Sequence, residues 1–415
     1  MINKKIEFSP PDVTDAEIEE VIKTLKSGWI TTGPKTKEFE RKIAEYIGVN
    51  KAVCFNSATA AMELTLRILG IGHGDEIITT AYTYTASASI IDHVGAKIVI
   101  IDTAADSFEM DYDKLADAIT DKTKAIVPVD IAGKMCDYDK IYKVLESKKE
   151  LFKANNEIQG LFNRVIVLAD AAHAFGAKRY GMKCGQVADF TCFSFHAVKN
   201  LTTAEGGALV WRNDLGLDDE WLYKQFMLYS LHGQSKDALA KTQKGAWEYD
   251  IVYLAYKCNM TDILAAFGLI QLSRYEGLMK RRKELIEAYD RELLPLGIKS
   301  VQHYDDGYAS SGHLYLARIP GIDEAERNEV IMRMAEAGIA CNVHYKPLPM
   351  FTAYKRLGFD IKDYPNAFDM YKNEITLPLH SLLSDDDVAY VCRCFKRAIE
   401  EILSERTTVA EVALV

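Results

Sequence analysis

Three apolar runs without polar alternation stand out in the first half of the chain. AKIVIID (96–102), KAIVPVD (124–130) and RVIVLAD (164–170) are rich in Val and Ile, and each ends in Asp. Such runs are typical of parallel strands that are buried on both faces of a sheet. Helical patterns near 112–119 and 137–145 separate the runs. This strand–helix–strand order predicts an open α/β sheet with helices on both sides.

The N-terminal part reads as helices, a strand and turns around that sheet. Thr14 and Glu17 predict a capping box for a helix that ends near Ser27. A short strand over 51–55 leads into the small-residue turn SATAA, which opens a helix. GIGHGDE (70–76) resembles a nucleotide fingerprint, but it follows a helix and precedes a strand, so we expect a turn.

The second half is predicted to carry the connection to a second domain. Helical spacing from about residue 260 to 293 predicts a long helix that joins a large domain, 1–275, to a smaller α+β domain, 276–415. The stretch 147–163 is expected to be a surface helix or excursion. Residues 213–245 are expected to be irregular and polar.

Composition narrows the possible functions. The 415 residues carry a net charge of −10, which argues against nonspecific nucleic-acid binding. The eight cysteines form no CxxC pair, so we expect free thiols and no metal site. The N-terminus lacks an apolar signal core and no apolar run approaches membrane length, so we expect a cytoplasmic enzyme with no membrane partner.

Candidate chemistry gathers in TCFSFHAVKNLTTAEGGALV (191–210), which predicts a strand, a turn around Lys199 and a second strand. A buried lysine has a lowered pKa and becomes a usable nucleophile. The alternative is a surface lysine that extends to solvent from a strand end. Asp170, at the end of an apolar run, reads as an acid or simply as a helix N-cap.

The SATAA turn supplies a candidate anion site. Backbone N–H groups at the start of a helix, with nearby hydroxyls, suit a phosphate, although Ser and Thr are also common N-caps. The candidate residues are Ser57, Ala58 and Thr59. An anion cradle, an acid and an amine together match the needs of pyridoxal 5'-phosphate (PLP).

Two segments, DAAHAFGA (170–177) and FSFHAVKNLTTAEGG (193–207), resemble the DegT/DnrJ/EryC1/StrS sugar aminotransferases, a family of fold-type-I PLP enzymes. The resemblance runs from about Gly28 to about Val388. It implies a large domain with a mostly parallel seven-stranded sheet, followed by a smaller C-terminal α+β domain. The implied reaction transfers an amino group from L-glutamate to a nucleotide-linked 4-keto-6-deoxy-hexose, with a UDP-sugar favoured. A 3-keto sugar is the nearest rival.

The resemblance also implies roles for residues around the cofactor. Lys199 would form the Schiff base and act as general base, and Asp170 would pair with the pyridine nitrogen. His173 would face the ring's phenolate oxygen, although a lone histidine is more often structural. Ser194 would bind the phosphate, and the ring of Tyr84 would lie over the cofactor.

Substrate and partner contacts follow from the same resemblance. Thr31, Thr32 and His344 would approach the sugar, although His344 reads equally well as a strand-end histidine. In YKCNMTD (256–262), Lys257 and Asn259 replace the Asn and Arg of the usual family motif. One of them would reach a partner's cofactor phosphate, which implies a homodimer with shared active sites.

Two other readings use the same scaffold. A dehydratase of this fold has His in place of the lysine, and Lys199 argues against it. A catalytically silent binding or regulatory protein would be expected to lack Lys199 or Asp170, and both are present.

Overall fold

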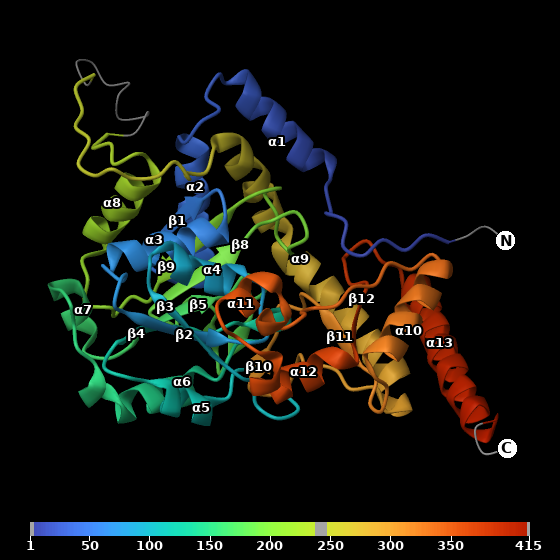
Figure 1. Cartoon of the computed structure of the whole chain (residues 1–415). Helices are drawn as coiled ribbons and strands as arrows, with labels where there is room; N and C mark the ends of the chain where they lie inside the picture. Colours follow the sequence, from blue (N-terminus) through green and yellow to red (C-terminus); the bar gives the residue numbers. More distant parts are fainter. Residues whose placement is uncertain (1–3, 237–246, 413–415) are drawn as a thin grey trace.

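A seven-stranded sheet forms the centre of the computed structural model, which describes residues 4–236 and 247–412 (Figure 1). The strand order is β1-β9-β8-β5-β4-β2-β3. Only β9 runs antiparallel to its neighbours, and the other pairs are parallel. The strands are β1 (Ala52–Phe55), β2 (Glu76–Thr80), β3 (Lys97–Ile101), β4 (Thr123–Val127), β5 (Ile166–Asp170), β8 (Phe190–Ser194) and β9 (Gly207–Trp211). The predicted mostly parallel α/β sheet is confirmed.

Helices cover both faces of this sheet, and each face has its own apolar core. One core joins the sheet to α2 (Pro34–Ile47), α5 (Tyr112–Ala118), α6 (Tyr138–Ser147) and α9 (Asp262–Leu293). The other joins it to α3 (Ala58–Ile68), α4 (Ala86–His93) and α8 (Asp219–Ser230). Burial on both faces explains why the strands read as continuous apolar runs.

The C-terminal part packs on the far half of α9 around a third apolar core. Its elements are β11 (Tyr315–Arg318), α10 (Glu324–Glu336), α11 (Thr352–Arg356), α12 (Pro365–Lys372), β12 (Glu374–Leu377) and α13 (Asp385–Val412). A fourth apolar cluster, which includes Tyr82, Val129 and Leu316, joins this part to the strand ends of the large sheet. The predicted boundary at residue 275 falls inside the continuous helix α9, and the division into two domains stays a prediction.

The remaining elements are short or peripheral. They are α1 (Asp15–Lys26), α7 (Glu157–Phe162), β6 (Lys178–Arg179), β7 (Met182–Lys183) and β10 (Tyr308–Ala309). The capping box of Thr14 and Glu17 on α1 is confirmed. The predicted surface excursion over 147–163 contains α7, and Gln159 ties it to the end of α3 by donating to the Leu69 carbonyl at 2.9 Å.

The prediction for residues 213–245 was wrong where the structure describes them. The segment contains α8, whose N-terminus is capped by Asp218 through the Trp221 N–H. Leu222 and Phe226 are spaced one turn apart and are buried against the sheet, while charged side chains cover the outer face. Averaged along the chain, a two-faced helix of this kind reads as polar. Residues 237–245 lie outside the described residues.

Two sequence expectations concern thiols and membranes. All eight cysteines are free, as predicted, and six of them are buried. In the described ranges, no helix combines the length and the apolar character needed to cross a membrane.

Candidate active site

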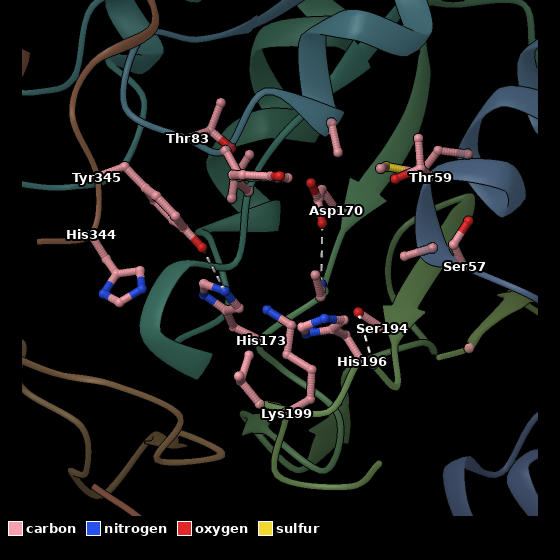
Figure 2. Close-up of a pocket in the computed structure, with 18 of the residues that line it drawn as sticks. Ser57, Thr59, Thr83, Asp170, His173, Ser194, His196, Lys199, His344 and Tyr345 are labelled. Atoms are coloured by element: carbon pink, nitrogen blue, oxygen red, sulfur yellow. Dashed lines mark hydrogen bonds between the residues drawn. The ribbon is translucent and has the colours of Figure 1, made fainter. Parts of the chain in front are cut away.

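A cavity of about 440 Å³ lies at the carboxyl-terminal edge of the sheet (Figure 2). Ligands in open α/β sheets bind at this edge because the strands end there and the loops diverge. Nine residues predicted from the sequence line the cavity: Ser57, Ala58, Thr59, Tyr84, Asp170, His173, Ser194, Lys199 and His344. Four others do not line it: Thr31, Thr32, Lys257 and Asn259.

The start of α3 forms one wall and fits a phosphate group. Ser57 caps the helix, and its hydroxyl accepts from the Ala60 N–H at 3.1 Å. The next strand, β9, passes so close that a Cβ on Gly207 would lie 2.3 Å from the Ala58 nitrogen. Only glycine leaves this helix end open to the cavity. The free N–H groups and the positive end of the helix dipole therefore face a space that suits an anion.

Asp170 lies at the end of β5 and lines the cavity, among the other labelled side chains of Figure 2. Its Oδ2 accepts from the Ser87 hydroxyl at 2.6 Å, and Oδ1 accepts from the Ala172 N–H at 3.2 Å. Ser87 in turn lies 2.8 Å from the Thr83 hydroxyl. Burial raises the pKa of Asp170, while both hydrogen bonds and the charge of Lys199 lower it. The arrangement positions a carboxylate to pair with a buried cation.

Lys199 follows β8 and is half-buried in the cavity wall. Burial lowers the pKa of its ammonium to about 8, and the charge of Asp170 acts in the opposite direction. A pKa near neutrality makes a substantial fraction of the amine available as a nucleophile or base. A half-buried position and a lowered pKa suit the roles expected of Lys199, which stay predictions.

The hydrogen bonds of His173 determine its tautomer. Its Nδ1 accepts from the Ala132 N–H at 3.2 Å, so in the neutral ring the proton lies on Nε2. Burial and the charge of Lys199 lower the pKa of His173, which keeps the ring neutral. Nε2 lies 3.1 Å from the Tyr345 hydroxyl and can donate to it (Figure 2). His173 therefore presents a hydrogen-bond donor to the cavity.

His344 and Tyr345 bring the C-terminal part of the chain to the cavity. The Nδ1 atom of His344 lies 2.9 Å from the Thr376 hydroxyl on β12. The Tyr345 ring lies 6.0 Å from that of Tyr84, between centroids. The sequence reasoning missed Tyr345 and Ser87. Ser87 lies four residues after Thr83, and a pair of hydroxyls at that spacing ahead of a helix was the available signal.

The four predicted residues outside the cavity form a separate cluster. Thr32 donates to the Met260 carbonyl at 2.6 Å and accepts from the Asn259 amide, which itself accepts from Lys257. The Asp262 carboxylate accepts from the Gly33 N–H at 2.7 Å and fixes the loop that carries Thr31 and Thr32. One chain alone does not bring this cluster to its own cavity.

Comparisons with known proteins identify the family of this chain. A profile of the DegT/DnrJ/EryC1/StrS aminotransferase family matches residues 11–396. The chain belongs to this family. Its fold is that of Spr1654 from Streptococcus pneumoniae, a candidate sugar aminotransferase solved in a PMP form and a PLP form. The PMP form has 56% identity and a TM-score of 0.93, and the match covers 96% of this chain and 100% of that one.

Two further relatives are similar over nearly their whole length. The spore coat polysaccharide biosynthesis protein SpsC of Bacillus subtilis is 38% identical, covering 94% of this chain and 96% of its own. The UDP-4-amino-4-deoxy-L-arabinose–oxoglutarate aminotransferase of Shewanella sediminis is 34% identical, covering 98% of this chain and 100% of its own. The protein is a PLP-dependent sugar aminotransferase with a fold-type-I architecture.

The residues present fit the cofactor. The open end of α3 suits its phosphate, Asp170 suits its pyridine nitrogen, and Lys199 suits its aldehyde. The Nε2–H of His173, which faces the Tyr345 hydroxyl in this structure, would donate to the phenolate oxygen in its place when the cofactor is bound. Each group of PLP thus has a partner of matching chemistry in one cavity.

Proposed function

We propose that the protein transfers an amino group from L-glutamate to a nucleotide-linked 4-keto-6-deoxy-hexose, with a UDP-sugar favoured, in polysaccharide biosynthesis. The observation that carries the proposal is the convergence of Lys199, Asp170 and the α3 N-terminus on one cavity. The name of the Shewanella relative, a 4-amino sugar–oxoglutarate aminotransferase, supports the position and the donor. The name of SpsC, a spore coat polysaccharide biosynthesis protein, supports a role in polysaccharide biosynthesis.

The chain's own residues divide the work. When bound, PLP supplies the electron sink that makes the amino-bearing carbon acidic. Asp170 holds a proton on the pyridine nitrogen, because an adjacent carboxylate favours the charged form. Lys199, once its amine is free, takes the proton from one carbon and returns it to another. His173 fixes the ring position through its Nε2–H, and the start of α3 holds the phosphate throughout.

A panel of keto-sugars tests this assignment. UDP-, dTDP- and GDP-linked 4-keto and 3-keto sugars are each incubated with the enzyme and [¹⁵N]glutamate, and the products are analysed by mass spectrometry. We expect ¹⁵N incorporation with a UDP-4-keto sugar. Preferred amination of a 3-keto sugar would replace the proposed substrate with its nearest rival. Turnover of none of them would contradict the substrate class.

We infer that the active unit is a homodimer in which each chain completes the other's cofactor site. Lys257 and Asn259 lie outside their own cavity, and exposed apolar residues precede both this segment and the Thr31 loop. Leu254 is 100% exposed and Ile30 is 48% exposed. Large exposed apolar side chains grouped in this way mark association surfaces. Two-fold symmetry would make both sites composite.

Complementation between inactive chains tests the dimer. Lys199→Ala is mixed with a Lys257→Ala, Asn259→Ala double variant under conditions of subunit exchange. The removed phosphate contacts are worth on the order of 1.5–3 kcal/mol, or roughly ten- to a hundredfold in cofactor affinity. One site per mixed dimer should be intact, so activity should return at limiting PLP. Confirmed exchange without recovered activity would refute the crossing contacts.

A further inference from the structure

Three polar side chains form a continuous line from the cavity wall into the C-terminal core. His344 lines the cavity, and its Nδ1 lies 2.9 Å from the Thr376 hydroxyl. The Thr376 hydroxyl lies 2.6 Å from Oε1 of Glu374. The other oxygen of Glu374 accepts from the His344 backbone N–H at 3.0 Å. The carboxyl group is therefore tied to the histidine at two points, through its side chain and its backbone.

The two residues at the inner end of this line are shielded from solvent. Thr376 and Glu374 both lie on β12 and are 0% exposed. No residue that the structure describes forms an ion pair with Glu374. Isolated buried carboxylates are costly, so a carboxyl group in this position tends to hold its proton.

The outer end faces the ligand space. His344 is neutral near pH 7, because burial and the charge of Lys199 lower its pKa to about 4. Its ring stacks on Phe8 at 5.5 Å between centroids and meets Tyr345 edge-on at 5.0 Å. Thr376 occupies Nδ1, so Nε2 is the ring nitrogen left for a ligand. Across the described part of the chain, Nε2 has no hydrogen-bond partner.

The line has two fully hydrogen-bonded arrangements that differ by one proton. With Glu374 ionised, Thr376 donates to the carboxylate and must accept from His344 Nδ1–H, which leaves a lone pair on Nε2. With Glu374 protonated, the carboxyl donates to Thr376, and Thr376 donates to Nδ1. The neutral ring then carries its proton on Nε2. The protonation state of Glu374 thus decides whether His344 offers a donor or an acceptor to the cavity.

We propose that His344, Thr376 and Glu374 form a proton relay that protonates the keto oxygen of the sugar as that oxygen is replaced by nitrogen. The proposal rests on the proposed function. Three hydrogens move one place each: from His344 Nε2 to the keto oxygen, from the Thr376 hydroxyl to Nδ1, and from Glu374 to the Thr376 oxygen. The negative charge ends on Glu374. This first delivery turns the keto oxygen into a hydroxyl group. The incoming amine has two protons to lose: the first reloads the relay in the reverse direction, and a second delivery through the relay then lets the hydroxyl leave as water. The amine's second proton reloads the relay as nitrogen takes the place of the oxygen.

The surroundings of Glu374 keep the relay loaded near neutrality. Burial raises its pKa to about 8, although the Thr376 and His344 N–H hydrogen bonds and the charges of Arg327 and Arg318 lower it. These arginines have other partners: Arg327 donates to the Tyr371 carbonyl at 3.0 Å, and Arg318 donates to the Asn373 amide oxygen at 3.1 Å. On the opposite side, the Tyr82 hydroxyl donates to the His344 carbonyl at 3.0 Å. An acid of this strength can give up its proton at the pH at which the enzyme works.

The first test reads the tautomer in the protein without substrate. Full-length protein is labelled with [¹⁵N]histidine, and the His344 signal is assigned by its loss in His344→Gln. We expect Nε2 to be protonated at pH 6 and unprotonated at pH 10, with the change following Glu374. In Glu374→Gln the amide donates permanently to Thr376, so Nε2 should stay protonated throughout. A wild-type Nε2 whose protonation does not change over this range would overturn the relay.

The second test measures the reaction with the keto-sugar in a single turnover, against pH. The wild-type rate should fall above about pH 8 as the relay unloads. Thr376→Val should lose about 10²-fold or more in this step, the usual size of a general-acid contribution, while Thr376→Ser restores it. Thr65→Val is a matched control, since Thr65 is also buried and its hydroxyl, within residues 4–236 and 247–412, bonds only the Ala61 carbonyl one helical turn back. A Thr376→Val enzyme with the wild-type rate and pH profile would overturn the relay.

The two tests separate this inference from the proposed function. A tautomer change that follows Glu374, in a protein that aminates no keto-sugar, would refute the function and support the proton path. If the enzyme aminates a keto-sugar but the His344 tautomer does not depend on the protonation of Glu374, the proposed function is supported and the relay is refuted.

Discussion

Removal of the Ser87 hydroxyl should weaken cofactor binding through Asp170. Ser87 is 0% exposed and donates to Asp170 Oδ2 at 2.6 Å. Its own oxygen lies 2.8 Å from the Thr83 hydroxyl, so Ser87 is held in place from behind. In Ser87→Ala the Oδ2 atom of Asp170 loses its only side-chain donor among the described residues. Ser87 does not line the cavity and acts as a positioning residue.

The size of the effect follows from the type of bond. A hydrogen bond to a buried charged group contributes about 1.5–3 kcal/mol. Since one pKa unit corresponds to about 1.4 kcal/mol, the pKa of Asp170 should rise by roughly one to two units. Burial already raises this pKa, and Ser87 opposes that rise. Loss of Ser87 should therefore raise the pKa of Asp170 further. As the pH falls, the variant should lose the ionised Asp170 that pairs with the pyridine nitrogen at a higher pH than the wild type does.

The assay is the dissociation constant of PLP, measured by fluorescence quenching of the apoprotein from pH 5 to pH 9. Ser87→Ala should bind PLP roughly ten- to a hundredfold more weakly near neutrality. The pH below which PLP binding is lost should be higher than in the wild type by about one to two pH units. Ser89→Ala, on the same helix α4, makes the same change without a bond to Asp170 and should match the wild type. Equal affinity and an unshifted pH for the loss of PLP binding in Ser87→Ala would refute the reasoning.

Three further predictions concern the phosphate-binding start of α3, the amine of Lys199 and the buried carboxyl group of Asp130. In Gly207→Ala, a Cβ 2.3 Å from the Ala58 nitrogen should push α3 away, cost about 1–3 kcal/mol of stability and abolish PLP retention. The control Gly277→Ala, which has open space around it, should change neither stability nor PLP retention. Retention of PLP in Gly207→Ala would contradict a phosphate site at the start of α3. The rate at which apoprotein captures PLP is followed by borohydride reduction and peptide mapping to Lys199, and it should be half-maximal near pH 8 and level off above about pH 9. At pH 7 about 10% of the amine is free, against about 0.04% for an ordinary lysine. A rate still climbing at pH 10 would argue against a lowered pKa. Burial raises the pKa of Asp130 to about 7 in the folded protein, against about 3.9 in the unfolded chain. The contribution of Asp130 to the free energy of unfolding is therefore full below pH 4 and falls by on the order of 4 kcal/mol as the pH rises to 7. The melting temperature of Asp130→Asn relative to wild type should rise over this range, and a constant difference between the two melting temperatures would refute the raised pKa.

The sheet and part of the cavity could be predicted because they depend on local sequence patterns. Continuous apolar runs that end in Asp placed β3, β4 and β5 correctly, and parallel strands bring their carboxyl ends to one edge. Local patterns account for five of the predicted residues that line the cavity, namely Ser57, Ala58, Thr59, Asp170 and Lys199. The other four, Tyr84, His173, Ser194 and His344, were implied by the family resemblance. The small-residue turn at Ser57 and the Gly-Gly pair after Lys199 also carry meaning in the sequence alone, since each marks a close backbone approach.

The supporting residues could not be predicted, because burial and long-range pairing decide their roles. Ser87 lies in an ordinary helical segment and becomes important only because the first turn of α4 brings its hydroxyl to Asp170 at the end of β5. Glu374 lies in the strand NEITLPL and reads as an edge charge until β12 is seen to be covered. The helix α8 was missed for a related reason, since its apolar face matters only against the sheet. Partners distant in the sequence leave no local signal.

Two buried carboxyl groups approach the cavity from opposite parts of the chain, and their partners give them opposite roles. Burial raises the pKa of both Asp170 and Glu374. Asp170 receives donors from Ser87 and a backbone N–H and faces the site of a cationic ring nitrogen, which favours its anion. Glu374 has no ion-pair partner among the described residues and is linked to the cavity only through Thr376 and His344, so it keeps its proton. Environments that separate two acids in this way assign one to charge stabilisation and the other to proton donation. The division of labour therefore arises from the partners of each carboxyl group, which the fold supplies from α4 on one side and from the His344 loop on the other.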